Sequence, residues 1–263
     1  MLKVLKLLRY SFFDMLRSKW IVIYTVFFLF TGFMLLYFNA DLSRAVVSLM
    51  NIVLVFIPLI SCMLGTIHYY NSREFIELLL AQPVKREQVF LGNYLGVAFS
   101  LSLAYILGLG IPFLAYGVTR SPDTGSFVMM MAVGVLLTFI FSALAYWISM
   151  VITDRMKGFG SVIVLWLYMA VLYDGIFLLL LTAFQEYPLE KPAIVLTTLN
   201  PIDLSRVLIM LKLDVAALLG YTGAVFKKFF GTSTGMLIAS GTMLIWIVVP
   251  VTGLALSSQK KDF

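Results

Sequence analysis

The sequence predicts an all-α membrane protein with six transmembrane helices. Of its 263 residues, 62% are hydrophobic and only 12% are charged, and the mean hydropathy is +1.01. A water-soluble domain normally carries about 25% charged residues. We therefore exclude a soluble enzyme and a nucleic-acid-binding protein. The net charge of +6 is better explained by membrane topology than by a phosphate partner.

Six apolar segments are long enough to cross a bilayer, which takes roughly 20 helical residues. We place them at residues 20–38, 46–67, 93–117, 127–152, 161–184 and 236–256. Most of the connecting loops are short, so residues 1–263 are predicted to form a single transmembrane domain.

Residues 1–19 are predicted to form an amphipathic helix at the membrane interface. Basic residues recur on one side, and apolar residues recur on the other, at Leu5, Leu8, Phe12, Met15 and Leu16. A signal peptide would have a much shorter charged region, and no small-residue cleavage site follows the first apolar segment.

The distribution of Lys and Arg predicts that both termini lie in the cytoplasm. Basic residues cluster in the N-terminal helix, in the loops after the second and fourth spans, and at the C-terminus. The two short loops on the other side carry only Arg44 and Arg120. Loops rich in Lys and Arg are retained on the cytoplasmic side.

The cytoplasmic loop 68–92 contains a predicted short helix at residues 74–81, which Pro83 ends. Charged residues, including Glu74, Glu77 and Arg86, surround an apolar run formed by Leu78, Leu79 and Leu80. This loop is a candidate contact site for a cytoplasmic partner.

The outer segment 185–235 contains a second predicted helix. Asn200 suits the N-cap, Pro201 the first helical position, and Asp203 the positive end of the helix dipole. Apolar residues then recur on one face, with Asp203, Arg206 and Asp214 on another. The pattern predicts an amphipathic helix on the outer surface.

Two polar residues lie within apolar spans. A carboxylate such as Asp174 costs a few kcal/mol in the membrane unless it is protonated, partnered or hydrated. Asp174 therefore either lines or gates a path through the helices, or makes a structural contact. Asn51 is a weaker candidate for the path, with helix packing as its alternative. Gly92 and Gly96 have a spacing that allows close helix approach but is common by chance.

The sequence offers no catalytic, cofactor-binding or metal site. It contains no Gly-Lys pair, so it lacks a phosphate-binding loop, and any ATP must be bound by another polypeptide. The single Cys62 and single His68 exclude an internal disulfide and a Cys/His metal site. An aspartyl enzyme would need a pair of carboxylates, whereas the spans contain one.

Two segments resemble the ABC-2-type permeases. Asp-Met-Leu-Arg-Ser-Lys-Trp at 14–20 is similar to the family's D-x-L-R-x-[KR]-W motif, and residues 77–96 are similar to its L-L-L-x-x-P-[VL] segment. Within the family, residues 199–206 and Asp174 resemble the permeases that serve nitrous oxide reductase maturation. The chain departs from the family pattern at residues 72–75, and at Asn93, where the family has lysine.

The resemblance implies a homodimer in the bacterial inner membrane. Its surroundings are membrane lipid, and no nucleic acid is expected as a partner. An ATP-hydrolysing subunit is expected to dock on the loop formed by Glu74, Glu77, Leu78, Leu79, Leu80, Pro83 and Arg86. A periplasmic partner is expected on Asn200, Pro201, Asp203 and Arg206.

The complex is expected to export a sulfur species, or otherwise to energise assembly of a copper–sulfur centre. Two alternatives remain open: an exporter of another substrate, and a membrane scaffold that docks periplasmic proteins without transport. A neighbouring ATPase gene favours transport, and its absence favours the scaffold.

Overall fold

The computed structural model describes residues 2–38, 42–81, 84–117, 124–184, 190–213 and 229–260. The described residues form helices and contain no strand. Among the described residues, six stretches are by themselves long and apolar enough to cross a membrane, as predicted, and the bent pair Pro192–Thr198 and Pro201–Lys212 reaches that length only when its two helices are taken together. The six are α2 (Lys19–Phe38), α3 (Leu42–Asn71), α5 (Arg86–Ala115), α6 (Thr124–Val151), α7 (Arg155–Leu167) continued by α8 (Tyr173–Ala183), and α12 (Ser233–Lys260).

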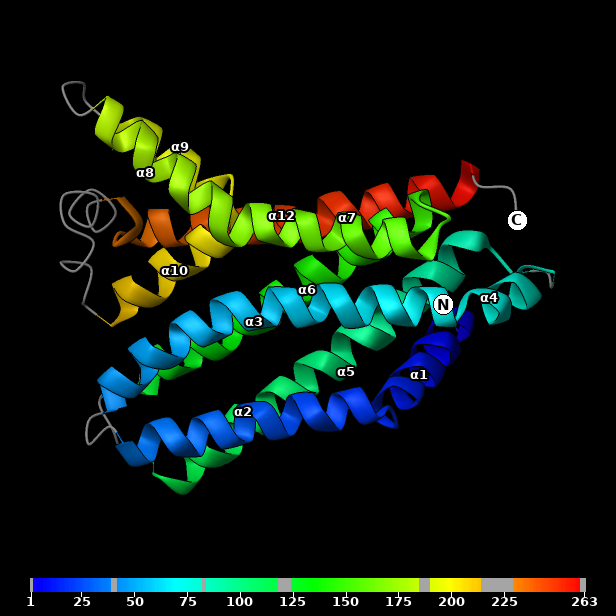
Figure 1. Ribbon diagram of the computed structural model, residues 1–263, viewed down its shortest axis with the longest axis horizontal. Coiled ribbons are helices and arrows are strands. Elements are labelled where there is room, and N and C mark those ends of the chain that lie inside the picture. Colours follow the sequence, from blue (N-terminus) through cyan, green and yellow to red (C-terminus); the bar gives the residue numbers. More distant parts are fainter. Residues whose placement is uncertain are drawn as a thin grey trace.

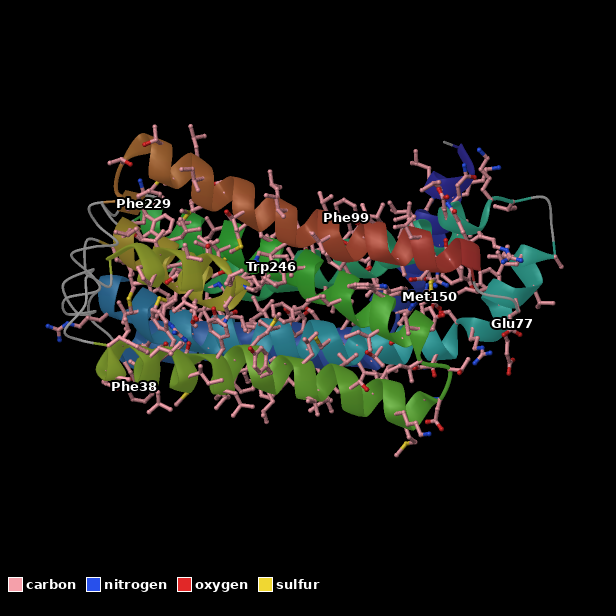
Figure 2. The ribbon with its side chains drawn as sticks, turned by 90° about the horizontal axis from the view of Figure 1, so that it is seen from above. Phe38, Glu77, Phe99, Met150, Phe229 and Trp246 are labelled. Carbon is pink, nitrogen blue, oxygen red and sulfur yellow. The ribbon has the colours of Figure 1, made fainter. Side chains whose placement is uncertain are left out.

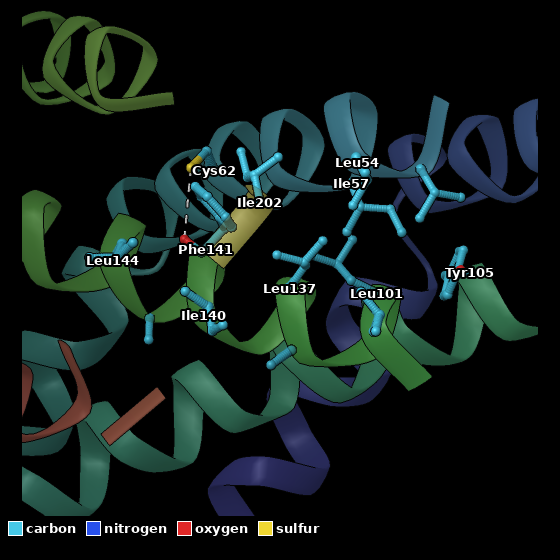
Figure 3. Close-up of a cluster of buried hydrophobic side chains, with 14 of the residues drawn as sticks. Leu54, Ile57, Cys62, Leu101, Tyr105, Leu137, Ile140, Phe141, Leu144 and Ile202 are labelled. Atoms are coloured by element: carbon cyan, nitrogen blue, oxygen red, sulfur yellow. Dashed lines mark hydrogen bonds between the residues drawn. The ribbon is translucent and has the colours of Figure 1, made fainter. Parts of the chain in front are cut away.

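Helices α3, α5 and α6 form the centre of the bundle (Figure 1). Leu54, Leu101 and Leu137, one from each helix, face one another in the core with Ile57 (Figure 3). In the most apolar 18-residue stretch of α5, and likewise of α6, 61% of the residues are buried. The corresponding share is 17% in α7–α8 and 22% in α12. The peripheral helices therefore leave wide apolar faces for lipid or for another subunit.

Helix α1 (Leu2–Leu16) lies along α5, because α5 presents two glycines to it. A Cβ atom at Gly96 would lie 2.6 Å from Ser11 Cβ and 2.8 Å from the Leu8 carbonyl oxygen, and Gly92 is similarly close to α1. Ser11 also donates a buried hydrogen bond of 2.7 Å to Asn93 Oδ1. The structure thus confirms that the Gly92–Gly96 spacing allows close approach of two helices.

The buried face of α1 agrees in part with the predicted one. Met15 is buried as predicted, and Leu8, Phe12 and Leu16 are half-buried, but Leu5 is 65% exposed and the polar Ser11 is buried against the bundle. The reason is that α1 packs on the glycine-lined surface of α5, which accepts a small polar residue such as Ser11. Periodicity therefore located the helix and most of its apolar face, but not the burial of Ser11.

Both ends of the described chain lie at the same end of the bundle as helix α4 (Arg73–Leu80), shown in Figure 1. Glu77 of α4 lies at the opposite end from Phe38 and Phe229 (Figure 2). An even number of crossings brings the two termini to one side of the bundle. This is the end for which the distribution of Lys and Arg predicts a cytoplasmic location, and we use the label cytoplasmic end in that sense.

The two described helices between α8 and α12 turn back into the bundle. Helix α9 (Glu190–Thr198) runs inward, and α10 (Pro201–Lys212) runs outward after a bend of 110° (Figure 1). Most of α10 is buried against α3, α6 and α12, so the prediction of an amphipathic helix on the outer surface was wrong in its placement. Asp203 is buried along with the apolar residues because it has polar partners inside the protein. Asp214, assigned to the polar face of this helix, lies outside the described residues.

Candidate functional site

A polar cluster lies where the fifth span meets the re-entrant pair α9–α10. Arg206 Nη1 of α10 lies 2.9 Å from Asp174 Oδ2 of α8 and 3.0 Å from Asp203 Oδ1, one turn earlier on its own helix. One guanidinium therefore bridges two carboxyl groups from two elements. We call Asp174, Asn200, Asp203 and Arg206 the polar cluster.

Asn200 organises the turn between α9 and α10. Its Oδ1 accepts a hydrogen bond of 3.0 Å from the backbone N–H of Ile202, which caps α10. Its Nδ2 donates to the Met169 carbonyl oxygen at 2.8 Å and to Asp203 Oδ2 at 3.2 Å. Pro201 takes the first helical position, where its missing N–H costs nothing. The sequence prediction of this cap is confirmed.

The fifth span is not a regular α-helix at this level. A π-helical turn, η2 (Tyr168–Leu172), joins α7 to α8, and Met169, which accepts from Asn200, lies within it. Such wide turns in α-helices often occur at functional sites. The irregular turn is thus hydrogen-bonded through the Met169 carbonyl group to Asn200, at the start of α10.

Helix α8 continues the fifth span beyond the π turn, and its Phe177 and Leu181 are partly buried and pack against the core. None of its residues is fully buried, in contrast to α10. Two links fix it to the re-entrant pair: the Asp174–Arg206 ion pair, and a hydrogen bond of 2.7 Å from the Tyr173 hydroxyl to the Leu196 carbonyl oxygen. These polar contacts therefore add to the apolar packing of Phe177 and Leu181 in orienting α8.

The electrostatics of the polar cluster are unbalanced. The Asp203 side chain is only 7% exposed, whereas those of Arg206 and Asp174 are 26% and 31% exposed. One positive charge faces two carboxyl groups, so the cluster carries negative charge unless one carboxyl group holds a proton. Asp174 lies on the exposed side of the polar cluster, whereas Asp203 lies on its buried side and orients the Arg206 guanidinium.

The structure brings together residues that the sequence assigned to different roles. Asp174 was a candidate for a path or gate, whereas Asn200, Pro201, Asp203 and Arg206 were candidates for periplasmic docking. Asn200, Pro201 and Asp203 are buried, so their side chains face the interior rather than a partner. Asn51 is exposed on α3 and is not part of the cluster. The need of a membrane carboxylate for a cation was the signal that could have linked Asp174 to Arg206.

Helix α4 is the short helix that the sequence predicts in the loop after the second span, and we call it the lever helix. It is anchored by the buried Ile76, by a Tyr10–Phe75 ring contact of 4.9 Å to α1, and by the bond from Arg73 to the Thr153 carbonyl oxygen at 3.4 Å. These contacts link the lever to α1 and to the loop between α6 and α7.

The exposed side of the lever helix carries most of the predicted partner contacts. Glu74 and Glu77 are exposed, and Leu78 is 70% exposed, but Leu79 and Leu80 are partly buried and pack towards the core. Arg86 opens α5 beside the lever and is exposed, whereas Pro83 lies outside the described residues. Within the leucine run, Leu78 is therefore the residue most available to a partner.

Sequence reasoning missed a contact beneath the lever. His68 Nδ1 lies 2.9 Å from the Tyr146 hydroxyl, and His68 Nε2 lies 3.3 Å from Asp14 Oδ2, so α1, α3 and α6 meet at one imidazole. The His68 hydrogen bond lowers the pKa of Asp14 more than its partial burial raises it. A polar cavity of about 480 Å³ opens here, bounded also by Ser72 and Phe75. The start of the lever thus borders a polar cavity through Ser72 and Phe75, while Ile76 is buried in the core.

Comparison with known proteins identifies the family of the chain. Residues 42–262, which include all spans after the first, match the family described as ABC-2 family transporter protein. The chain belongs to this family. It is a multi-pass membrane permease, and as the permease of an ABC transporter it works with an ATPase partner.

Two relatives carry a more specific name. The chain is 28% identical over 221 residues to a protein of Pseudomonas aeruginosa named a probable ABC transporter permease protein, NosY, covering 78% of this chain and 80% of the relative. It is 25% identical over 211 residues to the protein of the same name from Stutzerimonas stutzeri, covering 74% of this chain and 76% of the relative. The ABC-2 permease is thus NosY-like.

Proposed function

We propose that this permease acts as NosY in nitrous oxide reductase maturation. It would form a homodimer in the inner membrane with both termini cytoplasmic, and each copy would dock a NosF-like ATPase that binds the ATP. A NosD-like protein would be the periplasmic partner. The complex would export a sulfur species or energise assembly of the copper–sulfur centre. The NosY-named relatives, aligned over most of both chains, are the observation that carries this assignment.

The coupling step starts at the lever helix. ATP binding closes the ATPase and pushes the exposed face of α4, which includes Leu78. Because Phe75 stacks on Tyr10 and Arg73 contacts Thr153, this push reaches α1 and the start of α7. A rigid helix such as α7 transmits the displacement towards the outer side.

The polar cluster acts as the outer latch in this proposal. Displacement of α7 reaches α8 through the π turn, and α8 is fastened to α10 by the Asp174–Arg206 pair. Separating this pair lets α8 swing away from the re-entrant helices. Re-forming the pair closes the route, so the latch alternates with the nucleotide state of the ATPase.

Leu78→Asp is expected to uncouple the permease from its ATPase. Leu78 is exposed, so the fold is retained, but a carboxylate in an apolar interface is expected to weaken ATPase binding about tenfold or more. The measurement is co-purification of the ATPase and ATP hydrolysis by the reconstituted complex.

Met156→Asp is the matched control for Leu78→Asp. Met156 is 82% exposed on α7, three residues after Thr153, the residue that Arg73 of the lever contacts. Equal weakening by the two variants would assign the effect to added charge and contradict the lever assignment.

Asp174→Asn is expected to keep the fold and impair the latch. Asparagine still accepts a hydrogen bond from Arg206, and the pair is partly exposed, so stability should change by less than about 1 kcal/mol. The lost charge weakens the closed state. We expect normal protein levels, basal ATP hydrolysis that no longer responds to the periplasmic partner, and little assembled copper–sulfur centre. Wild-type amounts of the centre would make the Asp174 carboxylate purely structural.

A further inference from the structure

Helix α1 forms one side of two adjoining surface cavities that differ in chemistry. The first is an apolar groove of about 710 Å³ between α1, α5 and α6, lined by Leu5, Phe12, Phe99, Leu103, Ile106 and Phe139 among others. The second is a basic pocket of about 590 Å³ on α1 and the residue that follows it, lined by Lys6, Arg9, Tyr10, Phe13, Asp14 and Arg17.

Arg9 and Phe13 line both cavities, so the groove and the pocket adjoin at these two side chains. The Arg9 guanidinium lies 5.8 Å from the centre of the Phe13 ring, at the border between the apolar and the basic parts. A ligand at this place meets a cation directly beside a hydrocarbon surface. An amphiphilic ligand, with an anionic headgroup joined to a hydrocarbon chain, matches this arrangement.

The charge of the pocket selects an anion. Three cations, Lys6, Arg9 and Arg17, face one carboxylate, Asp14. Asp14 is already engaged by the His68 imidazole at 3.3 Å, which reduces its opposition to an incoming negative group. Arginine and lysine are the side chains that bind phosphate most strongly, arginine with a paired hydrogen bond.

The position of the cavities fits the membrane surface. Helix α1 ends at Leu16, immediately before the spanning helix α2 begins at Lys19. The groove continues along α5 through Phe99, Leu103 and Ile106, which are all more than a third exposed. A headgroup in the basic pocket would therefore place its acyl chain along a membrane-spanning helix.

We propose that the cavities on α1 form a binding site for one anionic phospholipid, with the phosphate headgroup between Lys6, Arg9 and Arg17 and an acyl chain in the apolar groove. The lipid adds to the glycine contact in holding α1 on α5. Because α1 also stacks on the lever through Tyr10, the bound lipid supports the position of the lever helix. This site is independent of the transported substrate.

Native mass spectrometry of the full-length protein tests the proposal. The detergent-solubilised protein is incubated at low ionic strength with equal amounts of phosphatidylglycerol and phosphatidylcholine. We expect one retained phosphatidylglycerol per chain, and a preference that falls about fivefold for each of the changes Lys6→Gln and Arg9→Gln. Added salt should reduce the preference in the same direction.

Matched variants separate the two halves of the site. Lys157→Gln removes an exposed cation on α7, outside both cavities, and should leave retention unchanged. Leu103→Trp fills the apolar groove without changing charge and should lower retention of both lipids.

Several outcomes would overturn the site. Equal retention of the two phospholipids by the unmodified protein would contradict the claim that the site selects an anionic headgroup. An unchanged preference in Arg9→Gln would contradict binding of the headgroup in the basic pocket. Displacement of phosphatidylglycerol by millimolar inorganic phosphate, with no effect of Leu103→Trp, would identify a simple anion pocket instead of a lipid site.

Discussion

Replacing Arg206 with methionine is expected to destabilise the outer half of the protein more than any other change of one charged residue. The change leaves the Asp203 carboxylate buried without its cation. Removing one partner of a buried ion pair costs about 3–5 kcal/mol, because the remaining charge stays desolvated. Asp174 loses the same cation but is partly exposed, so it contributes less.

The cost of Arg206→Met should be recovered by neutralising the buried carboxylate. The double variant Arg206→Met/Asp203→Asn leaves no buried charge in the cluster. The amide oxygen introduced by Asp203→Asn can still accept the hydrogen bond that Asn200 now donates to the carboxylate. We expect most of the stability to return while function stays low, because the Asp174 latch still has no cation.

Thermal unfolding of the detergent-solubilised variants, followed by fluorescence-detected gel filtration, measures these differences. Arg155→Met serves as the control, because Arg155 is exposed at the cytoplasmic end and its loss should leave the unfolding temperature near that of the unmodified protein. An Arg206→Met variant as stable as this control would show that Asp203 holds a proton and needs no cation.

Gly96→Val is expected to detach α1 from α5. The first added carbon would lie 2.8 Å from the Leu8 carbonyl oxygen and 2.9 Å from the Phe12 backbone nitrogen, and backbone atoms cannot move aside as flexible side chains do. Overpacking of this kind typically costs about 1–3 kcal/mol. The Ser11–Asn93 hydrogen bond and the Tyr10–Phe75 contact to the lever would be lost with the helix.

Gly110→Val provides the matched control on the same helix. Gly110 has no atom within 4 Å of the added carbon, so the change in helix propensity is the same while the steric clash is absent. Hydrogen exchange of α1 amides should accelerate in Gly96→Val and stay unchanged in Gly110→Val. Equal protection of α1 in both variants would mean that α1 can shift along α5 without loss of packing.

Much of the fold followed from local features of the sequence. The six spans were found because apolar length is a property of each segment by itself. The cap formed by Asn200 and Pro201 was also predictable, since it involves neighbouring residues only. The helix of the lever was located from composition, although the burial of Leu79 and Leu80 towards the core was not.

The candidate site was only partly predictable. Asp174 was recognisable because a carboxylate in an apolar run is costly wherever the run is placed. Its partner was not, because Arg206 lies in a separate, later segment, and sequence periodicity placed that helix on the outer surface. The His68 contact was hidden for the same reason, since Asp14, His68 and Tyr146 come from three helices.

The sequence alone determined that this chain spans the membrane six times, carries no phosphate-binding loop and presents a charged helix beside its spans. These properties follow from hydrophobicity and motif content, which need no knowledge of neighbours. Only the tertiary structure decided that α9 and α10 turn back into the bundle and that Arg206 joins Asp174 to Asp203. The physical reason is that a buried charge is stable only where a distant segment supplies its counter-charge, and the packing of whole helices determines which segment that is.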